Sequence, residues 1–486
     1  MAIYYSEYGA AGDGVTDDLD AIVSAHAAAN EAGCEVRADR GAVYYISGAN
    51  KTAVIQTDTD WSGAVFIIDD SKVTPENRGN HIFRVSSRLP AKKLASVASL
   101  AKNQEKLDIS LEHDSLISVV DKTTMRYIRE GLNQDSGSPQ TDVFVAGKNG
   151  GIDMRTPIIW DYGNITSMTA YPINPEKLTV KGGYFTTIAN RAESHYTYYA
   201  RGIEITRSNT VIDGIHHEIM AELDHGAPYG GFLDISNCAG VTVQNCRLSG
   251  HKTYTTIGSA GAPVPMGSYD ISVNRAVNVT FKNCEQLNNI HDNTIWGIFG
   301  SNYSKNILFD NVKFSRFDAH MGVANAAIKN SVLGYMGIHL IGCGLFTVEN
   351  TKICGYSLIN LRSDYGSTWE GEIVIRDCVF IPRNGAKSDA VLIGGSYSGR
   401  HDFGYVCHMP KKITIDGLTI EDINPPECYP GPKIFAEFNG AYKNGEKYPY
   451  VLTEEVSIKN LTVKSGKPYI ISDNAFMFKN VKVNNN

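Results

Sequence analysis

Apolar and polar side chains alternate in short, repeated segments along most of this chain. The segment VTVQNC (241–246) has an apolar residue at every second position and ends in Asn245 followed by a small residue. Alternation with a period of two is typical of a β-strand that is buried on one face. An Asn or Gly after the strand tolerates a left-handed backbone conformation, so the chain can turn there. The segment therefore predicts a short strand followed at once by a corner.

The same pattern recurs at ten further places, at intervals of about 19 to 43 residues. A short β unit that is constant in its core and variable in its loops is typical of a solenoid, and its β periodicity predicts a parallel β-helix. The other copies are LTVKGG (178–183), TVIDGI (210–215), VTFKNC (279–284), ILFDNV (307–312), AAIKNS (326–331), FTVENT (346–351), IVIRDC (373–378), ITIDGL (413–418), VSIKNL (456–461) and FMFKNV (476–481). The corner asparagines are predicted to stack into a structural ladder: Asn245, Asn283, Asn311, Asn330 and Asn350.

A second set of strands places carboxylates on the outside of the predicted helix. The segments IEITRS (203–208), FLDISN (232–237) and YDISVN (269–274) share the motif Asp-Ile-Ser or its variant Glu-Ile-Thr. If the central isoleucines point inward, alternation puts the preceding acids on the outer face. Alignment of the motifs predicts a column of three carboxylates, Glu204, Asp234 and Asp270.

The N-terminal segment YGAAGDGVTDDLDAIVSAHAAANEAG (8–33) predicts a turn and then a helix of about four turns, with Thr16 as its N-cap. The stretch GAAGDGVTDDLDAI resembles the opening motif of the pectate-lyase-like right-handed β-helix superfamily, which includes polygalacturonases, lyases and the tailspikes or appendages of bacteriophages. The resemblance implies a right-handed β-helix whose first coil is capped by this segment. We therefore interpret Asp13, Asp17 and Asp18 as cap residues and not as a metal cluster.

Three regions follow from these patterns in an all-β chain. Residues 1–50 are expected to form the capping helix and first coil, and residues 178–486 the β-helix repeats with a C-terminal cap. Residues 51–177 fit the repeat poorly and are expected to form an elaborated, β-rich or irregular insertion. The nine cysteines include no CxxC pair, and Cys246, Cys284 and Cys378 share one position of the repeat, so we expect small buried side chains there rather than ligands or disulfides.

The net charge and the first residues of the chain limit which partners and which location we expect. A net charge of −7 gives no electrostatic reason to expect nucleic acid, and no apolar run is long enough to span a membrane. The first residues lack the basic and then apolar regions of a secretory signal, so we expect a cytoplasmic or phage-virion-associated protein. Phage proteins of the resembled kind are frequently trimers, which makes a homotrimer the expected assembly under that hypothesis.

Five loops that precede the third strands of successive units, and flank the acidic column, are rich in ionisable and aromatic residues, as binding loops on a rigid scaffold are. We expect them to converge on one groove beside the column. Their candidate catalytic acids are Glu222 and Asp224, and their candidate substrate-binding residues are His225, His251, Lys252, Tyr254, His291, Asp292, Trp296, Arg316, Asp318 and His320.

These residues favour a glycoside hydrolase that cleaves a poly- or oligosaccharide without a cofactor. Such enzymes need two carboxyl groups, about 5 Å apart for a retaining mechanism and about 6.5–9.5 Å apart for an inverting one. Candidates for the pair are Glu204, Asp234, Asp270, Glu222 and Asp224. The chain lacks the active-site motifs of polygalacturonases at matching strands, so pectin specificity is not implied.

Two alternatives remain open from the sequence. In a polysaccharide lyase the acidic column would bind Ca²⁺, and Lys252, Arg316 or a histidine would remove a proton beside a uronate carboxylate. In a phage-tail or surface adhesin the same surface would bind glycan without cleaving it.

Overall fold

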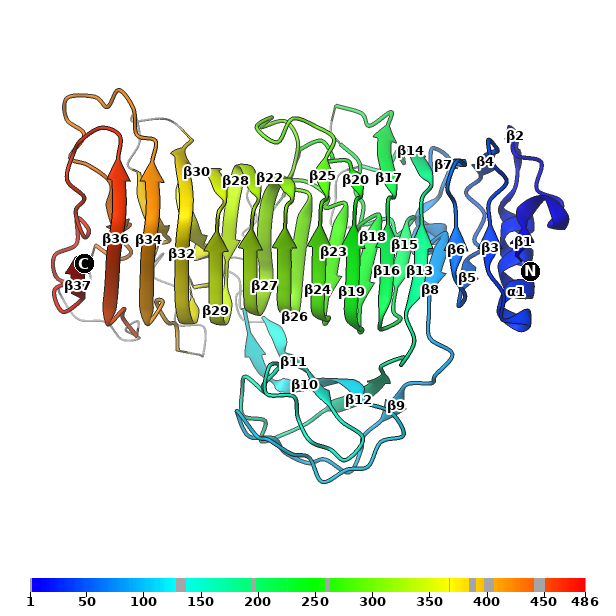
Figure 1. Ribbon diagram of the computed structural model, residues 1–486, viewed down its shortest axis with the longest axis horizontal. Coiled ribbons are helices and arrows are strands. Elements are labelled where there is room, and N and C mark those ends of the chain that lie inside the picture. The colour runs from blue at the N-terminus through cyan, green and yellow to red at the C-terminus, as the bar shows by residue number, and fades with distance from the viewer. Residues whose placement is uncertain are drawn as a thin grey trace.

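The computed structural model describes residues 2–485 apart from 128–136, 194–197, 225, 258–262, 367, 384–389, 397–405 and 441–450. The chain winds into an elongated parallel β-helix with its N- and C-termini at opposite ends (Figure 1). No helix in the described ranges is long and apolar enough to cross a membrane.

The coils stack into three parallel faces, and several long strands bend around a corner from one face to the next. The first face contains β1 (Ile3–Tyr4), β3 (Val36–Arg37), β6 (Thr59–Asp60), β13 (Leu178–Lys181), β16 (Thr210–Asp213), β19 (Ala239–Gln244), β24 (Val277–Lys282), β29 (Gly342–Glu349), β37 (Lys482–Asn485) and parts of β26 (Phe299–Asp310), β27 (Lys313–Lys329), β32 (Trp369–Pro382), β34 (Lys412–Ile420) and β36 (Glu455–Val463).

The second face contains β2 (Asp13–Asp17), β4 (Val43–Ile46), β7 (Val65–Asp69), β14 (Tyr184–Ile188), β17 (His216–Met220), β20 (Arg247–Leu248), β25 (Glu285–Gln286), β30 (Lys352–Gly355) and part of β28 (Val332–Leu340). The third face contains β5 (Ala53–Ile55), β8 (Phe83–Val85), β15 (Ile203–Ile205), β18 (Leu233–Ser236), β23 (Ile271–Asn274), β31 (Ser357–Leu361), β33 (Val391–Gly394) and β35 (Lys433–Phe435). This third face holds two of the candidate acids, Glu204 and Asp234.

The predicted asparagine ladder is present at the corner that follows the first face. All five asparagines have left-handed backbones, with φ between 44° and 56°. The Asn283 amide donates to Asn245 Oδ1 (3.2 Å), the Asn311 amide donates to Asn283 Oδ1 (2.8 Å), and Asn350 donates to Asn330 (2.9 Å). The Asn330 amide instead donates to Asp310, so the series of Asn–Asn hydrogen bonds is broken between Asn311 and Asn330. The ladder is therefore structural, as expected.

Stacked aromatic rings fill the interior beneath these corners. The centre of the Phe281 ring lies 5.5 Å from that of Phe299 and 5.4 Å from that of Phe309, and both pairs have edge-to-face geometry. All nine cysteines are free, and Cys246, Cys284 and Cys378 are buried where the repeat places a small apolar residue. The interior is thus a continuous column of apolar side chains along the helix.

The N-terminal end is covered by α1 (Leu19–Ala32), which packs on β1, β3 and β5 after a short 3-10 turn, η1 (Tyr5–Tyr8). The helix begins later than predicted, because residues 13–17 form β2 and Asp18 takes the N-cap position instead of Thr16. The Asp18 carboxylate accepts the backbone N–H groups of Ala11 and Gly12, so it holds the turn before the helix.

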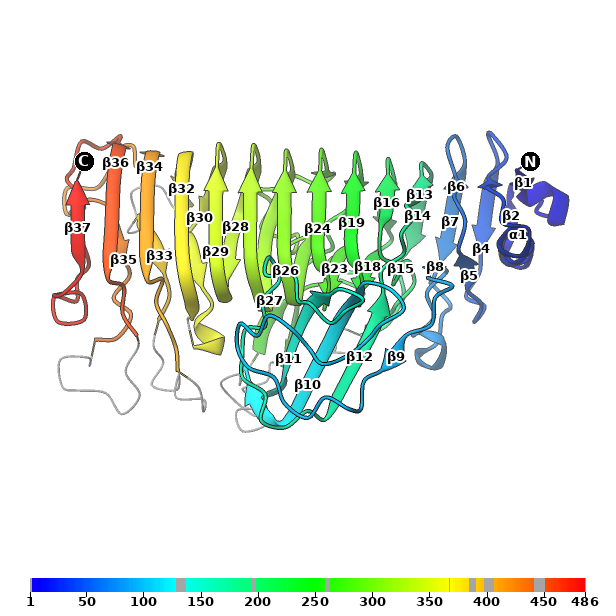
Figure 2. The ribbon, with the colours of Figure 1, turned by 60° about the horizontal axis from the view of Figure 1, so that its bottom comes forward.

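A separate antiparallel sheet lies along one side of the middle coils (Figure 2). Its strands are β9 (Lys92–Lys93), β10 (Ser115–Arg126), β11 (Ser138–Ala146) and β12 (Ser167–Pro172). A buried ion pair between Lys305 Nζ and Asp142 (2.8 Å) joins the sheet to the β-helix. The expected insertion boundary at residue 51 is wrong, because β5 to β8 already belong to regular coils.

The described residues also include a two-stranded hairpin and two further 3-10 turns: β21 (Tyr254–Ile257), β22 (Pro263–Met266), η2 (Pro75–Asn77) and η3 (Ser363–Tyr365).

The ladder generates a stability prediction at Asn283. Asn283→Ala removes the hydrogen bonds to Asn245 and Asn311 and puts an alanine in a left-handed backbone conformation that alanine disfavours. We therefore expect the free energy of unfolding to fall by about 1–3 kcal/mol. Asn283→Gly keeps the backbone relaxed and should lose less. The measurement is the shift of the urea-unfolding midpoint by circular dichroism. Equal losses for both variants would show that the left-handed backbone is not the constraint.

Candidate active site

Glu204 and Asp234 lie side by side on the exposed third face. Strand register pairs Glu204 directly with Asp234, and their side chains are 19% and 27% exposed. Neighbouring strands of a sheet are about 4.8 Å apart, so the two backbones place the carboxyl groups within range of one small reacting centre. These two predicted catalytic acids are therefore brought together.

Two basic side chains from the preceding coil complete this group. The imidazole of His81 lies between the acids, with Nδ1 3.8 Å from Glu204 Oε2 and Nε2 3.5 Å from Asp234 Oδ2. Arg84 is the strand neighbour of Glu204, and its Nε donates to the Glu204 carboxylate. We call His81, Arg84, Glu204 and Asp234 the carboxylate-pair site.

Sequence reasoning missed His81 and Arg84 because they lie within the region assigned to the insertion. A signal was available in the residues themselves. Phe83–Arg84–Val85 has the same apolar-polar-apolar order as Ile203–Glu204–Ile205, and the two segments pair in register.

Asp270 is not a member of the column, so the predicted alignment is wrong there. Asp234 pairs with Ser272, two residues beyond the expected partner. A shift of two residues leaves the inward and outward alternation unchanged, so the pattern alone could not detect it. Asp270 instead precedes β23 and is completely buried.

Asp270 joins a buried network beneath the loops. Its carboxylate lies 2.9 Å from His217 Nδ1 and 3.0 Å from His251 Nε2, and the other side of the His251 ring is 3.4 Å from Glu222. Burial alone would lower the pKa of His251, but hydrogen bonds to Asp270 and Glu222 raise it to about 10. Burial would likewise raise the pKa values of both acids, yet the neighbouring histidines lower them.

The protonated His251 ring lies between two ionised acids, Asp270 and Glu222. The network leaves almost no free space around these groups. The adjoining cavity measures about 10 Å³, close to the size of one water molecule. Asp270, Glu222 and His251 are therefore placed to hold the loops rather than to contact a sugar chain.

Asp318 forms a second buried ion cluster further along the third face. It lies 2.7 Å from Arg316 Nη2 and 2.8 Å from Arg362 Nη1, and the Tyr269 hydroxyl donates to it at 2.6 Å. Burial alone would raise its pKa, but the two guanidinium groups hold it well below its usual range. The guanidinium of Arg316 also lies 5.3 Å from the centre of the Trp296 ring. The predicted contact of Arg316, Asp318 and Trp296 with substrate is replaced here by contact with one another.

The other predicted residues do not reach the carboxylate-pair site by any contact in the described chain. Asp224 and His291 are exposed on loops, and Asp292 accepts bonds from the turn residue Thr294. The Lys252 backbone N–H donates to Glu222, and Tyr254 is buried in the β21–β22 hairpin. His320 contacts Asn302 on the third face, while His225 lies outside the described residues.

A groove of about 580 Å³ lies between the two loops that lead into His81 and Glu204. Its lining includes Lys72, Arg78 and Arg191 as cations and Glu193 as an acid, above the buried side chain of Tyr199. The loops are tied together because Ala200 N donates to the Arg78 carbonyl at 2.7 Å. Such a volume is within the range of about 300–1,000 Å³ that is usual for small-ligand sites.

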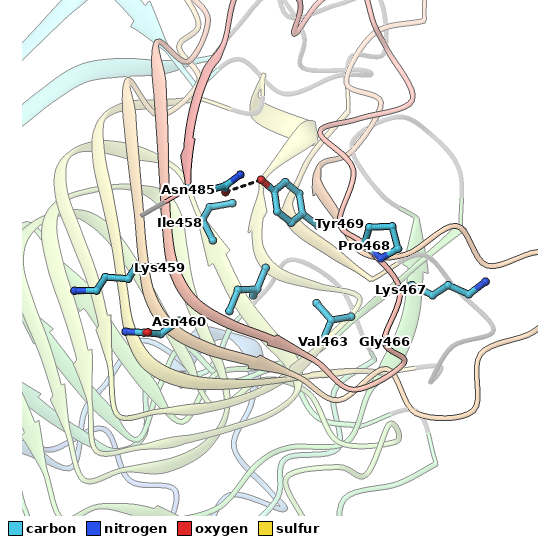
Figure 3. A pocket seen from close by; sticks show the side chains of 10 residues that line it. Ile458, Lys459, Asn460, Val463, Gly466, Lys467, Pro468, Tyr469 and Asn485 are labelled. Carbon is cyan, nitrogen blue, oxygen red and sulfur yellow. Dashed lines mark hydrogen bonds between the residues drawn. The ribbon is translucent and has the colours of Figure 1, made fainter.

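A second cavity, of about 340 Å³, lies at the C-terminal end of the β-helix (Figure 3). It is bounded by β36, by the turn through Pro468 and by Asn485, which accepts a hydrogen bond from the Tyr469 hydroxyl (2.8 Å). Its described lining has two lysines and two asparagines but no carboxylate, so it lacks the pair of acids that glycoside hydrolysis needs.

The calcium site of three stacked acids that a lyase would use is not formed, because Asp270 does not lie in line with Glu204 and Asp234. Within the described ranges, no group of three or more His, Cys, Asp or Glu side chains is arranged to hold a metal ion.

The buried network generates a pH prediction. A histidine whose pKa rises from about 6.5 in the unfolded chain to about 10 in the fold stabilises the fold most below pH 6.5 and loses that contribution as pH rises toward 10. We therefore expect the melting temperature to fall between pH 7 and pH 10 in the wild type, and to fall less steeply in His251→Gln. His291→Gln, at an exposed loop, is the matched control. Parallel slopes in all three proteins would contradict the assignment.

Comparison with solved structures identifies the fold. The tailspike of Pseudomonas phage phi297 superimposes with a TM-score of 0.55 at 12% identity, over 96% of this chain and 83% of that chain. The tailspike of Acinetobacter baumannii bacteriophage AP22, solved in complex with A. baumannii capsular saccharide, gives 0.53 at 11% identity, over 99% and 79%. No family model matches the sequence, and neither does any curated protein. The chain has the right-handed parallel β-helix fold.

Proposed function

We propose that this protein binds a poly- or oligosaccharide along its third face and hydrolyses it at the carboxylate-pair site. The observation that carries the proposal is the in-register placement of Glu204 and Asp234, with His81 between them and Arg84 beside Glu204. The two strands lie about 4.8 Å apart, a backbone spacing close to the carboxyl separation of about 5 Å in a retaining glycosidase. The capsular saccharide bound by the AP22 tailspike supports a glycan as ligand for this fold.

Each member of the site has a separate role in this mechanism. Glu204 is the nucleophile, because Arg84 holds its carboxylate in one orientation on the open face. Asp234 is the acid and then the base, which protonates the leaving oxygen and later activates water. His81 contacts both carboxyl groups and positions them relative to each other.

The groove between the loops before His81 and Glu204 supplies a place for the sugar chain. The cations Lys72, Arg78 and Arg191 line it and outnumber the lining acid among the described residues, Glu193. Because both loops run directly into strands of the site, a glycan held in the groove would lie next to the reacting centre.

The proposed cleavage generates a prediction for the two acids themselves. Glu204→Gln and Asp234→Asn should each lower the rate of reducing-end release by at least about 10²-fold, since each variant removes a group that acts in the transition state. Glu349→Gln, at a solvent-exposed acid on another face, is the matched control and should keep full activity. The assay measures reducing ends released from a panel of bacterial and plant glycans. Full activity of Asp234→Asn would contradict the proposed roles.

A glycan-binding protein without catalysis is the second candidate. The observation in its favour is that Glu204 is already ion-paired to Arg84, as a carboxylate in a purely binding surface can be. In that case the wild type would bind a glycan of the panel tightly and release no reducing ends from it.

A further inference from the structure

A cleft of about 220 Å³ lies where the inserted sheet meets the β-helix, away from the carboxylate-pair site. One wall comes from the end of β10 and from the segment before β12, and the other comes from the corners that follow the third face. It lies four to five strands beyond Asp234 along the helix, or roughly 20 Å at the strand spacing of a sheet. Its lining residues are Arg126, Tyr127, Trp160, Gly342, Cys343, Thr368, Glu370, Val406 and His408.

The wall on the inserted sheet presents an aromatic ring that is held in place by a chain of bonds. The Arg126 guanidinium lies 5.2 Å from the centre of the Trp160 ring, and Arg126 Nε donates to Gln140 Oε1 at 2.9 Å. Gln140 in turn donates to the carbonyl of Asp161, next to Trp160. Half-buried Trp160 is therefore fixed with part of its surface toward the cleft.

The opposite wall presents polar groups suited to sugar hydroxyls. Glu370 pairs with Lys102 of the insertion at 2.7 Å, and its side chain stays 41% exposed. Thr368 Oγ1 accepts the backbone N–H of His408 at 2.9 Å, which orders both residues on the cleft wall. An aromatic ring opposite a few fixed polar groups is the usual composition of a small-ligand site.

Backbone strain marks the same junction. Tyr127 has φ 48°, in the left-handed region that bulky residues rarely adopt. Its hydroxyl reaches Gly322, where an added Cβ would lie 2.3 Å from the hydroxyl oxygen. Tyr127 thus packs the inserted sheet against Tyr303 and Tyr365 of the β-helix, between the two cleft walls. Strain of this kind concentrates at functional sites.

We propose that this junction cleft binds one neutral pyranose residue of a glycan, with its ring on Trp160 and its hydroxyls bonded by Glu370 and Thr368. The volume is below the range of drug-sized ligand sites and suits a single sugar ring. Lys102 and Glu370 neutralise each other across the wall, and the Arg126 guanidinium is engaged by the Trp160 ring and Gln140, which favours a neutral sugar over a charged one. The identity of the ligand as a glycan rests on the proposed function.

The test is a fluorescence titration of the whole protein with free glucose, galactose, N-acetylglucosamine and glucuronate. We expect a neutral pyranose to change the tryptophan emission with a dissociation constant of about 1 mM, as suits a ligand of about twelve heavy atoms. Trp160→Phe should abolish the signal, because Trp61 and Trp369 are completely buried and Trp296 packs on Arg316 in the ion cluster around Asp318. Glu370→Gln should weaken binding at least about 5-fold.

Further variants separate folding from binding and one site from the other. Val406→Phe adds a bulky side chain at the exposed rim and should block the cleft without removing any buried contact or adding a tryptophan. Glu204→Gln and Asp234→Asn should bind the pyranose normally, because both residues lie roughly 20 Å from the cleft. Three outcomes would overturn the proposal: no response to any neutral pyranose, a response only to glucuronate, or unchanged binding in both Glu370→Gln and Val406→Phe.

Discussion

The in-register stacking of short parallel strands is the constraint on which the rest of the structure depends. Each coil repeats the same three faces at the fixed spacing of a β-sheet, so a side chain is defined by its face and its coil. The left-handed asparagines make the corner that keeps the register, and their amides bond along the helix axis. A scaffold of this kind places outward side chains of adjacent coils at a separation that is set by the backbone alone.

The carboxylate-pair site is a direct result of that spacing. Glu204 and Asp234 come close because β15 and β18 are neighbours in register, and His81 with Arg84 follows from the coil before them. The long loops have a different task. Buried ion networks around Asp270 and Asp318 hold the loops on the coils, with both acids fully buried and kept ionised by basic partners. Paired and hydrogen-bonded burial is the condition under which such charges are tolerated in an interior.

The repeat made most of the fold predictable, whereas the site was only partly so. The apolar-x-apolar pattern and its terminal Asn were sufficient for the β-helix and its ladder, because both depend on local alternation and backbone preference. Asp270 was misplaced because alternation cannot distinguish a register from one shifted by two residues. Burial of His251 and Arg316 depends on loops folding back over the coils, and no local pattern encodes that contact.

The central claim is that Glu204 and Asp234 cleave a glycosidic bond with water. The most direct measurement is mass spectrometry of products formed in H₂¹⁸O from a glycan that the wild-type protein depolymerises. The account predicts that each cleaved bond gains one water, with ¹⁸O at the new reducing end of one fragment and a hydrogen on the leaving oxygen of the other, and that Asp234→Asn yields no such fragments. Fragments without added water would show elimination and would contradict the hydrolytic pair.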